Sequence, residues 1–179
     1  IVGGSFDGTT IDTGGAAGAA GGHVSIRTTT GNLTLTDAVL TSGGTVPALQ
    51  AGNDAGNVFL SAADTLSTIG ITANGTAGAL GTGGDAGNIT LSAVNTITNA
   101  VADLTATAGN GSAGEIGGAG GGVTINSALG DVTLTTDIDV TGGDGVGERG
   151  GAGVDLHRGA VQERYGRGQS QKHRGACRE

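Results

Sequence analysis

The side chains that could carry acid–base, redox or metal chemistry are few and far apart in this chain of 179 residues. Only three histidines and one cysteine, Cys177, are present, and two of the histidines share the last 32 residues with that cysteine. Zinc and thiol redox sites need several such side chains at ligand spacing, so we expect no metal site of this kind. His23 stands where Asn57 and Asn88 stand in later repeats, which predicts a turn residue and not a ligand.

Carboxylates are more numerous, but they lie mostly where turns are expected, and Asp in a turn commonly accepts a backbone hydrogen bond. Only Asp137 and Asp139 form a close pair on one strand face, and no basic residue lies near them in the sequence. Cleavage of a sugar chain needs clustered carboxylates, often beside Arg or Lys. We therefore expect no enzyme and no catalytic residue. The other acids considered are Asp37, Asp64, Asp103 and Asp131.

Calcium is the one cofactor with a signal in the sequence, and the signal is weak. Residues 150–155, Gly-Gly-Ala-Gly-Val-Asp, match the start of a calcium-binding nonapeptide repeat with Asp155 as the ligand. Such a site needs tandem copies, but residues 142–147 carry Gly147 at the ligand position. A glycine-rich turn before a strand is the simpler interpretation, and no other cofactor is expected.

Paired hydroxyls recur beside the apolar positions and predict a surface array. If the coils stack, the hydroxyl pairs would form two columns. Such an array resembles the one on ice-binding β-solenoids. Threonine is also the ordinary residue of an exposed strand face, which is the alternative explanation. The pairs are Thr34 and Thr36, Thr65 and Ser67, Thr96 and Thr98, and Thr133 and Thr135.

The composition restricts the elements that could position these side chains. The chain has 40 glycines and three aromatic residues, and 36% of its residues are hydrophobic, against about 45–50% in typical globular domains. It cannot fill an ordinary core with large side chains. Short β-branched runs in a background of Thr, Asn and Gly indicate β structure.

Short β-branched segments near a glycine recur at nearly constant intervals in the sequence. The first residues of successive segments are 34, 31, 34 and 31 positions apart. Each unit contains two further short strands with one apolar face, and Ile11 ends an incomplete unit before the first. One such coil cannot bury its apolar face alone, whereas stacked coils can, so the sequence predicts an all-β parallel solenoid of about four coils of 31–34 residues. The opening residues are Val24, Val58, Ile89, Val123 and Val154.

Glycine-rich inserts separate the third strand of each unit from the next unit. In four of five inserts glycine recurs at every third position, as in residues 75–87, and the exception contains Pro47. A period of three is that of the polyproline-II helix. We expect extended segments that stack beside the β coils at the strand spacing of about 4.8 Å. A flexible Gly/Ala linker is the alternative.

The strands carry a resemblance to a known family. Gly-Asn-(Val/Ile)-x-Leu, in 56–60 and 87–91, and Gly-(Asn/Asp)-(Leu/Val)-Thr-Leu-Thr, in 31–36 and 130–135, resemble the repeats of filamentous-haemagglutinin-type large exoproteins and autotransporter passenger domains. The resemblance covers residues 10 to about 147. It implies a right-handed parallel β-helix, a bacterial surface or secreted protein, and an adhesive or stalk role.

Charge divides the chain into two parts. Residues 1–147 hold twelve acidic residues and one basic residue, a net charge of −11, whereas residues 148–179 hold seven basic and four acidic residues, a net charge of +3. We expect a solenoid in 1–147, as a fragment of a longer protein, and a basic tail in 148–179 that is disordered or results from a reading-frame error. No stretch approaches the roughly 20 apolar residues of a membrane span, so no membrane insertion is expected.

These observations predict a structural, adhesive repeat segment of a bacterial exoprotein, located outside the cell or on its outer surface. Its expected partners are neighbouring coils of the parent protein and carbohydrate or protein of a host or cell surface. We expect no nucleic-acid partner. Two alternatives remain open, namely an ice-binding solenoid and a β-helix that binds or cleaves polysaccharide.

Overall fold

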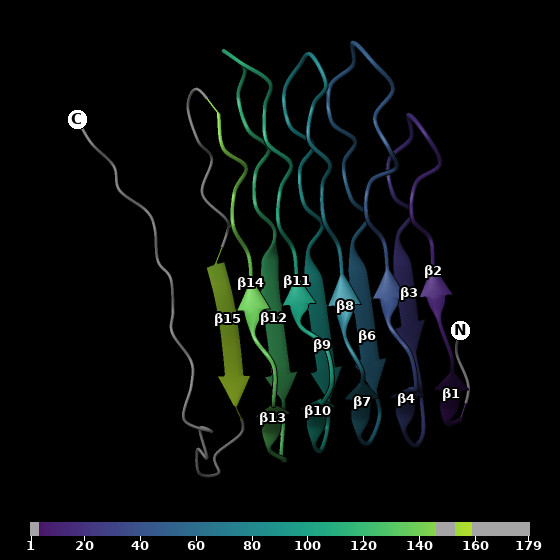
Figure 1. The fold of residues 1–179 in the computed structure, drawn as a ribbon. Helices are drawn as coiled ribbons and strands as arrows, with labels where there is room; N and C mark the ends of the chain where they lie inside the picture. Colours follow the sequence, from purple (N-terminus) through teal and green to yellow (C-terminus); the bar gives the residue numbers. More distant parts are fainter. Residues whose placement is uncertain (1–3, 146–152, 159–179) are drawn as a thin grey trace, which may run out of the picture.

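The computed structural model describes residues 4–145 and 153–158, the latter as backbone. This part of the chain contains strands and no helix, and Figure 1 shows them stacked side by side. The strands are β1 (Phe6–Gly8), β2 (Ile11–Asp12), β3 (Val24–Arg27), β4 (Leu33–Leu35), β5 (Val39–Leu40), β6 (Val58–Ala62), β7 (Leu66–Thr68), β8 (Ile71–Thr72), β9 (Ile89–Ala93), β10 (Ile97–Asn99), β11 (Leu104–Thr105), β12 (Gly122–Ser127), β13 (Val132–Leu134), β14 (Ile138–Asp139) and β15 (Gly153–Arg158).

Every third strand belongs to the same sheet. Sheet A has the order β1-β4-β7-β10-β13, sheet B the order β2-β5-β8-β11-β14, and sheet C the order β3-β6-β9-β12-β15. All pairs are parallel, because each coil continues in the same direction as the one before. The predicted all-β parallel solenoid of about four coils is confirmed, and its right hand stays a prediction.

The register follows the repeat step read from the sequence. Val24 pairs with Val58, Val58 with Ile89, and Ile89 with Val123. Strand β15 pairs with β12 in the same way, with Val154 opposite Val123. This strand lies inside the segment 148–179 that the charge pattern assigned to a tail, and the rest of that segment is outside the described residues.

The core is a stack of aliphatic side chains that point inward from all three sheets. In β6 and β9 the residues alternate between buried and outward positions, as a strand with one apolar face requires. Full burial of each aliphatic side chain contributes roughly 1.5–3 kcal/mol relative to exposure. The largest fully buried side chains are Leu33, Leu35, Leu60, Leu66, Ile71, Ile89, Leu91, Ile97, Leu104, Ile125, Val39 and Val58.

The glycine-rich inserts are ordered, and they extend the stack beyond the strands. The N–H of Gly15 donates to Ser42, that of Gly43 to Asn74, and that of Gly75 to Thr107, each over 2.9 Å to a carbonyl oxygen one coil further on. The two legs of an insert also bond to each other, as where Gly84 N–H donates to Thr76 C=O over 2.9 Å. The prediction of stacked, extended segments is confirmed, and the flexible-linker alternative is wrong.

Steric contact explains why these segments need glycine. A Cβ atom added to Gly83 would overlap the carbonyl oxygen of Gly109, and one added to Gly44 would overlap that of Ala16. Both obstacles are backbone atoms of a neighbouring coil, which cannot move aside like the end of a side chain. In the insert that contains Pro47, Leu49 adopts a left-handed φ of 71° and turns the chain.

Amide hydrogen exchange on the full chain tests the order of the inserts. We expect slow exchange at Gly75, Gly83 and Gly84, whose N–H groups all donate to carbonyl oxygens, and fast exchange at the exposed tip residue Ala113. Gly83→Ala should accelerate exchange in this insert and in the next one, whereas Gly4→Ala, where an added Cβ would meet only Thr30 Oγ1 at 3.8 Å, should not. Uniformly fast exchange across residues 75–87 would contradict the structure.

Candidate functional site

The outward face of sheet C presents two adjacent columns of side chains, because each strand places equivalent residues at the same height. Arg27, Ser61, Ser92 and Asn126 form the polar column, which occupies one register position of β3, β6, β9 and β12. Two residues earlier in each strand, Ser25, Phe59, Thr90 and Thr124 form the second column.

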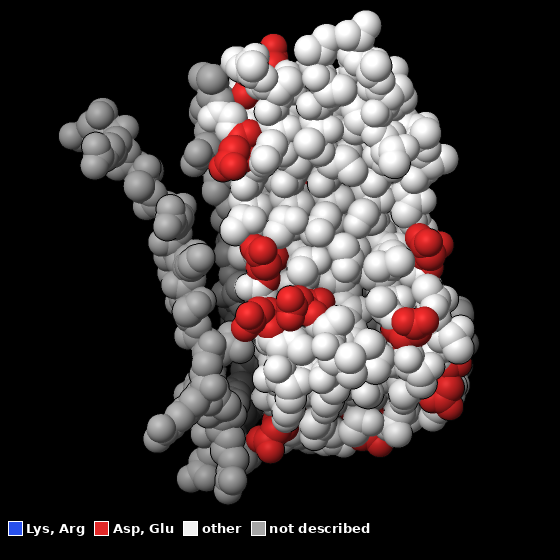
Figure 2. All heavy atoms as spheres, viewed as in Figure 1, with Lys and Arg blue, Asp and Glu red and all other residues white. Residues whose placement is uncertain are grey.

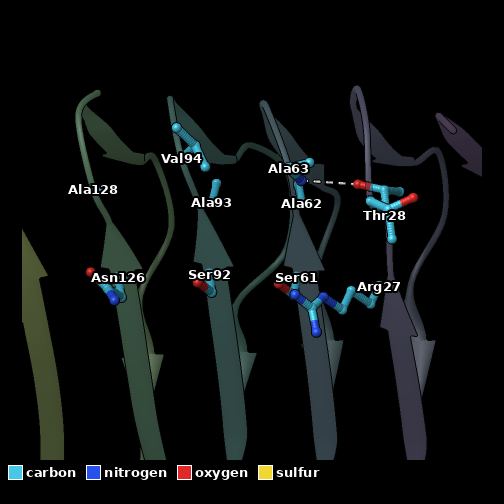
Figure 3. A pocket seen from close by; sticks show the side chains of 11 residues that line it. Arg27, Thr28, Ser61, Ala62, Ala63, Ser92, Ala93, Val94, Asn126 and Ala128 are labelled. Carbon is cyan, nitrogen blue, oxygen red and sulfur yellow. Dashed lines mark hydrogen bonds between the residues drawn. The ribbon is translucent and has the colours of Figure 1, made fainter. Parts of the chain in front are cut away.

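A groove of about 330 Å³ crosses four coils at the carboxyl ends of these strands. Figure 3 shows Arg27 reaching from β3 across to Ser61 on β6, with Ser92 and Asn126 in line beyond them. The small side chains Ala63 and Ala128 and the branched Val94 lie along the other side. Among the described residues, the lining consists of Arg27, Thr28, Thr29, Ser61, Ala62, Ala63, Ser92, Ala93, Val94, Asn126 and Ala128.

Not every polar group in the lining is available to a ligand. The hydroxyl of Thr28 donates to Gly31 C=O over 3.1 Å and accepts from Ala63 N–H over 3.0 Å. It therefore stabilises the turn between β3 and β4 and links this turn to the next coil. Arg27, in contrast, is exposed and is the only Lys or Arg whose side chain the structure describes. The groove therefore offers one guanidinium and a row of hydroxyl and amide groups.

The predicted hydroxyl array is only half formed. Thr34, Ser67, Thr98 and Thr133 stack in one column on the outward side of sheet A. The other members do not form a second column, because the inward-facing residues Leu33, Leu66, Ile97 and Val132 set the register and shift the pairs by two positions. Thr65 and Thr96 precede their strands, whereas Thr36 and Thr135 follow theirs.

Several of the described carboxylates serve as backbone acceptors. Asp54 Oδ1 accepts from Asp85 N–H over 2.8 Å, and Asp85 Oδ1 accepts from Ala119 N–H over 2.7 Å, so each fastens the next coil. Asp103 Oδ1 accepts from Asp137 N–H over 3.0 Å, and Asp139 Oδ1 accepts from Thr141 N–H over 3.2 Å. Of the suspected pair, Asp139 therefore has its carboxylate bonded to a backbone N–H, whereas Asp137 takes part only through its own N–H.

One carboxylate has a shifted acidity. Hydrogen bonds from the Thr10 hydroxyl and then from the Ala38 N–H hold the pKa of Asp37 below its usual value. Both bonds belong to the turn before β5 and its contact with the preceding coil. The shift therefore has a structural cause.

No group of three or more His, Cys, Asp or Glu side chains that could hold a metal ion occurs among the described residues. The calcium candidate Asp155 lies in β15, opposite Thr124 of β12, and its side chain is outside the described part. In Figure 2 acidic side chains are scattered over the described part of this face, where no Lys or Arg is seen.

Asparagine side chains form a ladder at the amino-terminal ends of the strands of sheet C. Asn57 Oδ1 accepts from Asn88 N–H, and Asn88 Oδ1 accepts from Gly122 N–H, both over 2.8 Å. His23 begins this ladder, since its Nδ1 accepts from Asn57 N–H over 2.8 Å. The residue is a structural acceptor, in agreement with the turn role expected from its position.

Sequence reasoning missed the groove and its polar column. The available signal was the serine that ends Asn-x-Phe-x-Ser, in 57–61, and Asn-x-Thr-x-Ser, in 88–92. The Thr-x-Thr pairs of the following strand are the more regular pattern in the sequence, but they do not mark the groove. The groove itself could not be read from the sequence, because it depends on the path of the turns after each strand of sheet C.

Comparison with known proteins gives no relative. No family, curated protein or solved structure matches this chain. In the described part of the chain, no helix has the length and hydrophobicity needed to cross a membrane. The resemblance to exoprotein repeats therefore stays a prediction from the sequence.

The asparagine ladder yields a stability prediction. Asn88→Ala removes the acceptor of Gly122 N–H and should lower the free energy of unfolding by about 1 kcal/mol. Asn88→Asp keeps an acceptor oxygen, as in the neighbouring Asp54–Asp85 ladder, and should retain most of the stability in buffer of moderate ionic strength. Denaturant unfolding of the full chain measures both changes, and equal losses in the two variants would contradict a role for the acceptor.

Proposed function

We propose that this chain is a structural and adhesive segment of a bacterial protein that is secreted or displayed on the cell surface, and that it catalyses no reaction. The observation that carries the proposal is the groove on sheet C, to which four consecutive coils contribute the same register position. A binding surface built in this way lengthens with every added coil. This property suits an elongated adhesin better than an enzyme, which needs one site.

The use of the carboxylates supports a role without catalysis. A general acid or base must be free to reach a substrate, whereas Asp54, Asp85 and Asp103 each accept a backbone N–H of the next coil. Asp64 accepts from the Asn95 side chain over 2.6 Å. These groups stabilise the stack, and none of the described carboxylates lines the groove.

The composition supports a place outside the cell. Residues 1–147 contain Arg27 as their only Lys or Arg, so they offer a single cleavage position to proteases specific for those residues. They also contain no cysteine whose oxidation would need control outside the cell. Ice binding receives less support, because a single column of hydroxyls replaces the expected two.

An adhesion assay tests the proposal. Beads carrying the full chain should be retained on at least one surface coated with cell-surface polysaccharide or glycoprotein, because the groove repeats over several coils. Beads carrying an unrelated acidic β-protein provide the control. Retention no greater than that of the control on every surface, or release of new reducing ends from a coated polysaccharide, would overturn it.

A further inference from the structure

We propose that the groove on sheet C binds an uncharged, linear polysaccharide that lies along the solenoid axis, with Phe59 as a stacking platform and Arg27 as a hydrogen-bond donor. The inference rests on the adhesive function proposed above and names the ligand class of its groove. The occupant follows from the direction, lining and charge of this surface.

The direction of the groove suits a chain-like ligand. Its polar column takes one residue from each of four successive coils, which follow one another at the strand spacing of about 4.8 Å. One sugar unit of an extended polysaccharide advances by a comparable length. Successive sugars would therefore meet Ser61, Ser92 and Asn126 in turn, each with similar groups available.

The lining matches both the hydroxyl groups and the apolar C–H groups of a sugar ring. Hydroxyl and amide groups both donate and accept hydrogen bonds, as sugar hydroxyls do, and the Arg27 guanidinium provides several further donors. On the opposite side, Ala63, Val94 and Ala128 present apolar carbon atoms toward which the C–H groups of a sugar can pack. Sites for small molecules usually combine apolar lining with a few placed polar groups in this way.

Phe59 is an exposed aromatic residue on the outward face of sheet C that does not contribute to the core. Its side chain is 42% exposed in the middle of sheet C, between Ser25 and Thr90 of the neighbouring strands. It stands two residues before Ser61 on the same outward face of sheet C, in the column beside the polar column, although it is not itself one of the residues that line the groove. An aromatic ring at this place could cover the apolar face of a sugar and would bury its own surface in doing so.

The net negative charge of residues 1–147 favours an uncharged ligand over an anionic one. Residues 1–147 carry a net charge of −11, from twelve acidic residues and one basic residue. A polyanion would be repelled by this field at moderate ionic strength. The residues described in the groove's lining include no carboxylate, so they do not favour a cationic ligand either. A neutral sugar chain is the occupant that both observations favour.

Affinity electrophoresis of the full chain tests this inference. We expect gels that contain hydroxyethylcellulose, galactomannan or mixed-linkage β-glucan to retard the protein in at least one case, and polygalacturonate to have no such effect. Phe59→Ala and Arg27→Gln should each weaken the binding by about tenfold, the effect typical of a residue central to an interface. Phe59→Tyr should keep it, because the ring remains.

Thr98→Ala on the outward side of sheet A provides the matched control and should leave the binding unchanged. Circular dichroism verifies that each variant keeps the β spectrum. Preference for polygalacturonate, equal weakening by Thr98→Ala and Phe59→Ala, or absence of retardation by all three neutral polymers would overturn the inference. If the beads still adhere to glycoprotein while no neutral polymer retards the chain, the adhesive function survives and only this ligand class is wrong.

Discussion

The hydrogen bond from one coil to the next is the interaction on which the rest of this structure depends. Buried backbone N–H and C=O groups must find partners, and here the partner of each strand is the equivalent strand one coil away. The bond from Val24 N–H to Asn57 C=O, over 2.9 Å, and that from Val58 N–H to Asn88 C=O, over 2.8 Å, repeat the same contact in successive coils. Every coil must therefore rise by the same distance at every point of its path.

This requirement explains the unusual composition. The inserts can keep pace with the strands only if their backbones approach as closely as neighbouring strands do, and Gly83 against Gly109 shows that a Cβ leaves no room for this approach. The turns meet the same requirement with side chains, since Asn57, Asn88 and Asp85 each accept a bond from a neighbouring coil. Glycine, asparagine and aspartate thus stabilise a stack whose buried hydrophobic residues, in the described part of the chain, are aliphatic and of moderate size.

The sequence predicted the features that depend on periodicity. The step from Val58 to Ile89 gave the register of sheet C, and the glycine period in residues 75–87 gave the extended inserts. It did not predict the groove, because turns of different length end the strands of sheet C. The Thr-x-Thr pairs were misleading because threonine fits any outward position, whereas buried residues such as Leu66 and Ile97 determine which threonines align.

The function proposed for this chain depends on the same stacking. Arg27, Ser61, Ser92 and Asn126 are far apart in the sequence and form one surface only because four coils align. Phe59 stands in the column beside them for the same reason. A slip of one coil by two residues would separate these side chains and leave the protein without a continuous binding face.

Disulfide trapping of the register tests this account most directly. In a Cys177→Ser background, Thr98→Cys combined with Thr133→Cys places two thiols on directly paired residues of β10 and β13, at a Cα distance of about 5 Å that a disulfide can bridge. Thr98→Cys combined with Thr135→Cys has the spacing that the hydroxyl pairs suggest. The account predicts a rapid intramolecular disulfide in the first pair and little in the second, and the reverse result would contradict the stacking described here.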